Sequence, residues 1–190
     1  GEEAGTITFG KRKQITYLNL YSLGSSVITG DITGMKLTYL RLSSMGSSVI
    51  TGDITGMKLT LTSLLLYSLG SSVITGDITG MKLTYLFLYN IGSSVITGDI
   101  TGMELTSLFL SSIGSSLTYG TNSLNITENY GIQLVGNTVF ATAAEYERLI
   151  HDAANATWSG AYPFTITAGT TENCPDWDEV KADVATLLTK

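Results

Sequence analysis

Residues able to carry acid–base or nucleophilic chemistry are scarce in this chain. Of its 190 residues, His151 is the one histidine and Cys174 the one cysteine, and only 14% are charged. His151 follows Glu147 by four residues, a spacing that predicts an ion pair along a helix. Cys174 has no second thiol and precedes Pro175, so we expect an inert thiol. The sequence therefore predicts no catalytic triad, no Cys/His metal cluster and no bound cofactor, and we expect a protein that is not an enzyme.

Four aspartates recur at equivalent positions of a repeated segment: Asp31, Asp53, Asp77 and Asp99. Stacked in one column about 5 Å apart, their carboxylates would repel unless something compensates their charge. One interpretation is a ladder of bound cations. The other is that each carboxylate accepts backbone N–H groups of its own or the next turn, as in Asx turns. We favour hydrogen bonding and predict no metal site, because the column offers few oxygen ligands per ion.

The elements that must position these residues come from an internal repeat. The string GSSVITGDITGM occurs four times without change, beginning at Gly24, Gly46, Gly70 and Gly92, and a shortened fifth copy follows. The starts are 22, 24, 22 and 22 residues apart, and we place the two extra residues of the long copy at 59–60. The chain therefore divides into an N-terminal cap (1–14), an array of five repeats (15–120) and a C-terminal α/β capping region (121–190).

The variable block of each repeat predicts a short strand. A period of 22 residues is too short for a helix pair and fits a solenoid with a strand in every turn. In LTYLRL, Leu40 and Leu42 alternate with Tyr39 and Arg41, so the leucines are expected to face inward. The same alternation recurs in every variable block.

The identical segment predicts the return path of each turn. Its glycines and β-branched residues disfavour a helix and favour extended chain, with a second short strand around VITGDI. We expect Val27, Ile28 and Ile32 to supply the other wall of the core. The predicted fold is a mostly β solenoid.

The pattern L-x-x-L-x-L, with Ile15 in place of the first leucine of the first copy and its L-x-L spacing present in five copies, is followed by a return segment ending in I-T-G-D-I-x-x-M and resembles leucine-rich repeats. The 22-residue period is most similar to the internalin-like repeats of bacterial secreted and cell-surface proteins, and the resemblance runs from Ile15 to about Ser116. It implies a right-handed superhelix. The position of the family's asparagine ladder holds Leu23 and its apolar equivalents here, which is a departure from the family. From the residues alone, a parallel β-helix is the alternative fold.

The capping region has its own helices and strands. Thr142 and Glu145 form a capping-box pattern that predicts a helix to about Ala154. A strand is expected within 123–140, another at 161–169, and a second helix after Asp176. No C-cap residue follows Leu188, so we expect the native chain to continue past residue 190.

Outward strand positions predict a binding face. These positions vary between repeats while the return segments stay identical, and an exposed aromatic stripe is costly in water. The residues assigned to this ligand-binding face are Tyr39, Arg41, Leu65, Tyr67, Tyr85, Phe87, Tyr89 and Phe109. The alternatives are that aromatic residues merely favour strands, or that another segment or a second copy covers the stripe.

We therefore expect a non-enzymatic binding or adhesion module that recognises a protein or glycan, or self-associates, through this face. The alternative is a structural spacer with no specific ligand. A nucleic-acid partner is not expected, because the chain has a net charge of −6 and its one basic run, 11–13, is short. No apolar run reaches the length of a membrane span. The resemblance implies an extracellular or cell-surface protein, although the acidic start has no signal peptide.

Overall fold

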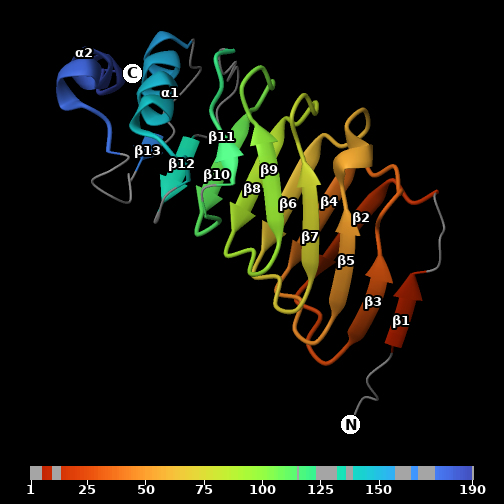
Figure 1. Cartoon of the computed structure of the whole chain (residues 1–190). Coiled ribbons are helices and arrows are strands. Elements are labelled where there is room, and N and C mark those ends of the chain that lie inside the picture. The colour runs from red at the N-terminus through yellow and green to blue at the C-terminus, as the bar shows by residue number, and fades with distance from the viewer. Residues whose placement is uncertain are drawn as a thin grey trace.

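The computed structural model describes residues 6–9, 14–114, 116–122, 132–135, 139–156, 164–166 and 174–189. The chain winds into a solenoid of about five turns with two parallel sheets, and two helices close its C-terminal end (Figure 1). The predicted β solenoid with a small C-terminal cap is confirmed.

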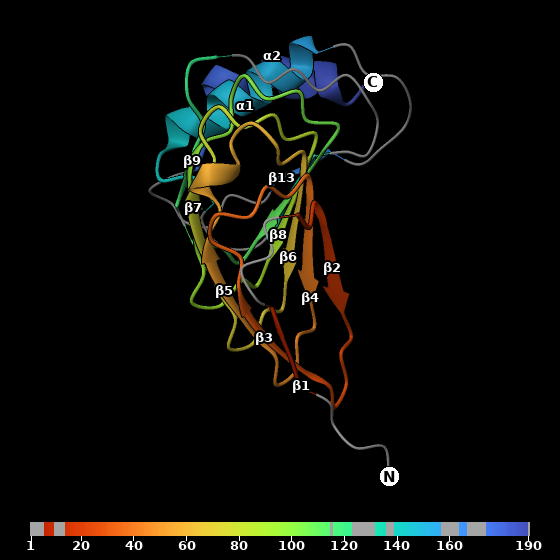
Figure 2. The same ribbon diagram turned by 90° about the vertical axis from the view of Figure 1, so that its right-hand side faces the viewer.

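Each turn contributes one strand to each sheet, and Figure 2 shows the two sheets as separate layers. The front sheet contains β2 (Tyr17–Tyr21), β4 (Tyr39–Ser43), β6 (Ser63–Tyr67), β8 (Tyr85–Tyr89), β10 (Ser107–Ser111), β12 (Ile132–Val135) and β13 (Phe164–Ile166). The return sheet contains β1 (Thr6–Phe9), β3 (Val27–Asp31), β5 (Val49–Asp53), β7 (Val73–Asp77), β9 (Val95–Asp99) and β11 (Leu117–Thr118).

The front strands bury alternate residues, as the sequence predicts. Leu40 and Leu42 of β4 are fully buried, and so are the equivalent leucines of β6 and β8. Neighbouring front strands pair without offset, so Leu40 lies beside Leu64 and Leu64 beside Leu86. Since a strand turns successive side chains to opposite faces, the residues between these leucines point away from the core.

The return strands supply the second wall, but with one residue fewer than predicted. Ile50 and Ile54 are fully buried, whereas Val49 is half-buried and Val95 is 49% exposed. The prediction that Val27 and its equivalents face the core was wrong, because adjacent residues of one strand cannot both point inward. The inward position two residues after each isoleucine is a glycine instead.

That glycine is required by the close approach of the preceding turn. A β-carbon at Gly52 would lie 2.6 Å from Cγ1 of Ile32 and 2.9 Å from the backbone nitrogen of Thr33. The φ angle of Gly52 is +149°, which other residues rarely adopt. The repeated I-T-G-D step is therefore a packing requirement.

Strands β3, β5, β7 and β9 pair with an offset of two residues relative to their sequence equivalents. Val49 lies beside Thr29, and Thr51 lies beside Asp31. The same offset recurs between β5 and β7 and between β7 and β9. The predicted column of aspartates is therefore wrong in its geometry, because each aspartate lies beside a threonine of the next turn.

A ladder of buried serines joins the turns where the front strand leads into the return strand. Ile50 donates its N–H to Oγ of Ser72 at 2.9 Å, and that hydroxyl donates to the carbonyl oxygen of Ser48 at 3.3 Å. Ser48 makes the same two contacts with the preceding turn, at 2.9 and 3.2 Å. Both serines are fully buried, so each hydroxyl satisfies one donor and one acceptor at an apolar corner.

A second ladder, of threonines, joins the turns where each front strand begins. Oγ1 of Thr62 donates to the carbonyl oxygen of Thr38 at 3.0 Å, and Oγ1 of Thr84 donates to that of Thr62 at 3.2 Å. The two-residue insertion of the long repeat precedes this corner. Leu59 is 84% exposed, while Leu61 takes the buried position that Leu37 and Leu83 occupy in shorter repeats. The insertion therefore bulges outward and leaves the stacking intact.

The capping region continues the front sheet and replaces the return sheet with helices. β12 pairs with β10 and β13 pairs with β12, all parallel. Helix α1 (Ala143–Asn155) connects β12 to β13, and α2 (Trp177–Leu187) packs beside α1 (Figure 1). The capping box of Thr142 and Glu145 is present as predicted. Parts of the predicted strands at 123–140 and 161–169 lie outside the described residues.

The serine ladder gives a first test of this fold. Ser72→Ala removes the acceptor of the Ile50 N–H inside the core, so we expect the free energy of unfolding to fall by about 1–3 kcal/mol. Urea unfolding followed by circular dichroism measures this change. Ser71→Ala, at the exposed neighbouring serine, is the matched control and should change stability by less than about 0.5 kcal/mol. Equal effects of the two changes would contradict the ladder.

Candidate binding face

The outward side chains of β2, β4, β6, β8 and β10 form one surface, which we call the front face. Because these strands pair without offset, the side chains fall into three columns along the solenoid axis. The first column is Tyr17, Tyr39, Ser63, Tyr85 and Ser107. The middle column is Asn19, Arg41, Leu65, Phe87 and Phe109. The third column is Tyr21, Ser43, Tyr67, Tyr89 and Ser111.

The centre of the front face is a cluster of aromatic rings. Phe87 and Phe109 stack with their centroids 4.5 Å apart and their planes 10° from parallel. Tyr67 meets Phe87 edge-on at 6.4 Å, and Tyr89 lies 5.3 Å from Tyr67 and 6.2 Å from Phe109. Leu65 lies beside Phe87 in the middle column. These contacts hold the apolar centre in one arrangement and leave its outer edge in water.

The N-terminal end of the front face is aromatic and positively charged. Tyr17 and Tyr39 stack at 4.3 Å, with their planes 11° apart. The guanidinium carbon of Arg41 lies 5.1 Å from the ring centroid of Tyr21, a cation–π distance. Burial raises the pKa of Tyr39 above its usual value, and the neighbouring hydroxyl of Tyr17 adds to this rise while Arg41 opposes it. Tyr39 is therefore a neutral hydrogen-bonding phenol at physiological pH.

The front face exposes tyrosine side chains to solvent and buries a serine that lies between them. Tyr17 and Tyr21 are 58% and 55% exposed, and Tyr67 and Tyr89 are also exposed. Ser43 lies between Tyr21 and Tyr67 in the third column and is nevertheless buried. The large side chains therefore spread over the small ones, and the surface offered to solvent is mainly aromatic.

The eight residues assigned to the ligand-binding face all lie outward on the adjacent strands β4, β6, β8 and β10. Tyr85 lies between Ser63 and Ser107 in the first column, beside the aromatic centre. Two further residues, Tyr17 and Tyr21, belong to the same surface and were not among the eight. The outward Y-x-N-x-Y spacing of β2 is the signal that identifies them.

The four repeated aspartates have hydrogen-bonding partners of the expected kind. Oδ1 of Asp53 accepts the N–H of Thr55 at 2.8 Å, and the same contact recurs for Asp31, Asp77 and Asp99. In addition, the N–H of Asp77 donates to Oγ1 of Thr55 in the preceding turn at 3.0 Å. The expected Asx-type hydrogen bonds are confirmed within each turn, and the bonds from the N–H groups of Asp53, Asp77 and Asp99 to threonine hydroxyls of the preceding turn form a third ladder.

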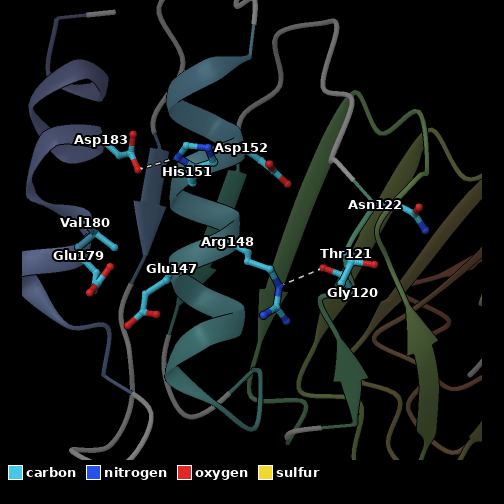
Figure 3. Close-up of a pocket in the computed structure, with 10 residues that line it drawn as sticks. All are labelled: Gly120, Thr121, Asn122, Glu147, Arg148, His151, Asp152, Glu179, Val180 and Asp183. Carbon is cyan, nitrogen blue, oxygen red and sulfur yellow. Dashed lines mark hydrogen bonds and ion pairs between the residues drawn. The ribbon is translucent and has the colours of Figure 1, made fainter.

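A groove of about 360 Å³ lies between α1, α2 and the segment that follows β11 (Figure 3). Its polar groups hold the cap in place. Arg148 donates to the carbonyl oxygens of Gly120 at 3.1 Å and Tyr119 at 2.6 Å. The hydroxyl of Tyr119 donates to Asp152 at 2.6 Å, and the backbone N–H of Tyr119 donates to buried Glu145 at 3.0 Å. This groove is therefore the junction between the array and its cap.

The one histidine belongs to the same junction, with a different partner from the one predicted. Nδ1 of His151 lies 3.0 Å from Asp183 on α2. Glu147 instead accepts the N–H of Asp176 at 2.8 Å, at the start of α2. The predicted pairing of His151 with Glu147 was wrong because a second helix, distant in sequence, packs against this face of α1. Cys174 is exposed.

No protein-family model matches this chain, and comparison with curated proteins and with solved structures finds no significant match. The fold itself defines the class: a parallel-strand β solenoid with a small helical cap. Within the described ranges, no group of three or more His, Cys, Asp or Glu side chains is placed to hold a metal ion. No described helix is long and apolar enough to cross a membrane.

The hydrogen-bonded carboxylates of Asp53 and Asp77 predict that the protein loses stability in acid. Hydrogen bonds from Thr55 and Thr79 lower the pKa of Asp53 and Asp77 below the ordinary value of 3.8. As the pH falls, these carboxylates therefore take up protons in the unfolded chain before they do so in the folded protein. Their contribution to the free energy of unfolding is full above the unfolded-state pKa and is lost as the pH falls through the lower folded-state pKa. Asp77→Asn should lower stability at neutral pH and flatten the loss of stability between about pH 5 and pH 2.

Urea unfolding at several pH values checks this expectation, and Glu104→Gln, at an exposed carboxylate, is the control. An unchanged pH profile in Asp77→Asn would contradict the stabilising hydrogen bonds from Thr79 to this carboxylate. A fall in the melting temperature of the wild type on addition of a chelator would indicate a bound cation in its place.

The cap junction gives a further prediction. Arg148→Met removes two hydrogen bonds to carbonyl oxygens while keeping most of the apolar stem, so we expect a loss of about 1–3 kcal/mol in stability. Lys181→Met is the control, because Lys181 pairs with Asp178 on the exposed surface of α2 and such pairs contribute little. Thermal unfolding compares the two, and similar effects would show that Arg148 does not fasten the cap.

Proposed function

We propose that this protein is a non-enzymatic binding module that recognises a macromolecular partner through its front face. The observation that carries the proposal is the aromatic surface on strands whose other side is already filled. Phe87 and Phe109 cannot serve the core, because Leu86, Leu88 and Leu110 of the same strands occupy it. Aromatic side chains are enriched at the core of protein interfaces, and tyrosine is among the residues that dominate their binding energy.

The chemistry of the front face supports binding over catalysis. Its outward positions carry a single charged side chain, Arg41, and no pair of carboxylates that could act as acid and base. The proposal therefore does not include an enzymatic step.

The class of repeat is also a proposal. The L-x-x-L-x-L strands, one per turn of 22 residues, support a divergent leucine-rich repeat of the bacterial surface type. The ladder formed by Ser48 and Ser72 would then replace the family's asparagine ladder in hydrogen-bonding the backbone of adjacent turns. An extracellular or cell-surface location follows from this resemblance.

The second candidate function is a structural spacer. Identical return segments support it, since a spacer needs only turns that stack and no distinctive pocket. The variation of the front face between turns favours binding, because a spacer gives no reason for aromatic residues to gather on β6, β8 and β10.

The two functions differ in what substitution of the aromatic centre does. Phe87→Ala and Phe109→Ala should each cost about 1 kcal/mol of stability or less, because each ring is half-buried and no core cavity forms. The same changes should weaken binding by about 2 kcal/mol if the rings are hot spots. A screen of glycans and proteins with the wild type and both variants measures the binding, and urea unfolding measures the stability.

Leu88→Ala on the inner side of β8 is the matched control and should cost about 2–5 kcal/mol of stability. A comparable loss in Phe87→Ala would show that the front face is core. Absence of any ligand or self-association that depends on the aromatic centre would favour the spacer.

A further inference from the structure

The front face carries no negative charge at its outward positions, although the chain as a whole is acidic. The chain has 16 acidic residues and 10 basic residues, yet none of the three outward positions on each of β2, β4, β6, β8 and β10 holds an acidic residue. Arg41 is the one charged side chain at these positions. A partner that meets the front face therefore encounters a single positive group in an apolar and phenolic surrounding, which favours a partner with a negative group at that place.

Arg41 is held ready for such a group. Its guanidinium lies over the ring of Tyr21, and it is close enough to Tyr39 of the same strand to oppose the rise in that residue's pKa. A guanidinium fixed against an aromatic ring keeps a planar fork of donors that fits a carboxylate in bidentate fashion.

The aromatic rings favour a peptide over a sugar. A sugar ring stacks on an open aromatic face, but Phe87 and Phe109 cover one face of each other, and Tyr17 and Tyr39 do the same. Tyr67 meets the stack at its edge. What remains is mainly ring edges and phenol hydroxyls, and tyrosine is enriched in the antibody paratopes that bind protein surfaces.

The pairing register of the front strands sets the distance between Arg41 and Phe87, the two residues that would anchor a partner. Arg41 lies beside Leu65, Leu65 beside Phe87, and Phe87 beside Phe109. Adjacent strands are about 4.8 Å apart, so the backbone positions of Arg41 on β4 and Phe87 on β8 are separated by two spacings, or about 10 Å. An extended peptide covers about 3.3–3.6 Å per residue, so three residues bridge that distance.

We propose that the front face binds an extended segment of a partner protein that carries a carboxylate and, about three residues away, an aromatic or branched apolar side chain. Arg41 takes the carboxylate, and the centre formed by Leu65, Phe87 and Phe109 takes the apolar side chain. The segment runs along the solenoid axis, across the strands of the front sheet. This inference rests on the proposed function and adds the chemistry of the partner.

A displayed library of random peptides, selected on the full chain, tests the inference. We expect enrichment of an Asp or Glu three residues from a Phe, Leu or Trp. Calorimetry with one enriched peptide should then show affinity about tenfold lower or more for Arg41→Met and for Phe87→Ala. Lys82→Met, which removes an exposed cation away from the front face, is the matched control and should leave the affinity unchanged.

A double-mutant cycle separates the ion pair from general weakening. Replacing the acidic residue of the peptide by Gln or Asn should cost about tenfold against the wild type and little further against Arg41→Met. Independent losses would overturn the assignment of Arg41.

Other outcomes overturn the inference and leave the proposed function in place. Enriched peptides without a carboxylate, binding of oligosaccharides alone, or self-association that Phe87→Ala abolishes would each show a partner of different chemistry. Failure of peptides, glycans, proteins and a second copy alike to bind would overturn the proposed function as well.

Discussion

The structure depends on the stacking of inward leucines and isoleucines from one turn to the next. A single turn has two short strands and cannot bury its own apolar side chains, so its core exists only between neighbours. The leucines of β4, β6 and β8 are fully buried because each has a turn on both sides. Leu20, in the first front strand, is only partly buried. The same dependence explains why α1 and α2 must cover the opposite end, with Tyr119 and Glu145 buried at the junction.

Polar groups make this stacking specific. The serine, threonine and aspartate–threonine ladders each join one turn to the next at a different part of the turn. The serine ladder satisfies backbone groups that would otherwise be buried without partners. The aspartate ladder also depends on the offset of the return strands, which places Asp31 beside Thr51 and separates the like charges. Packing and electrostatics therefore require the same register.

Much of this fold is predictable from periodicity, and the remainder shows where periodicity carries no information. The 22-residue period and the alternation of Leu40 with Arg41 predict the solenoid, the inward leucines and the outward front face. They cannot predict the register of the return strands, because an offset of two residues keeps Ile50 inward just as zero offset does. Identity of the repeats does not single out Ser72 either, since exposed Ser71 is equally invariant. The partner of His151 depends on packing of α2, which no local pattern encodes.

The contrast between constant and variable positions follows from the same physics. In the return segment, Ile, Gly, Asp, Thr and the second Ser each contact the neighbouring turn, so a change at one of them disturbs two interfaces at once. The outward residues of the front strands pack beside one another but close no ladder and fill no core. Their side chains can differ from turn to turn at little cost to the stack. A solenoid of this construction therefore separates the residues that hold it together from those that are free to determine what it binds, and the aromatic centre around Phe87 lies wholly among the latter.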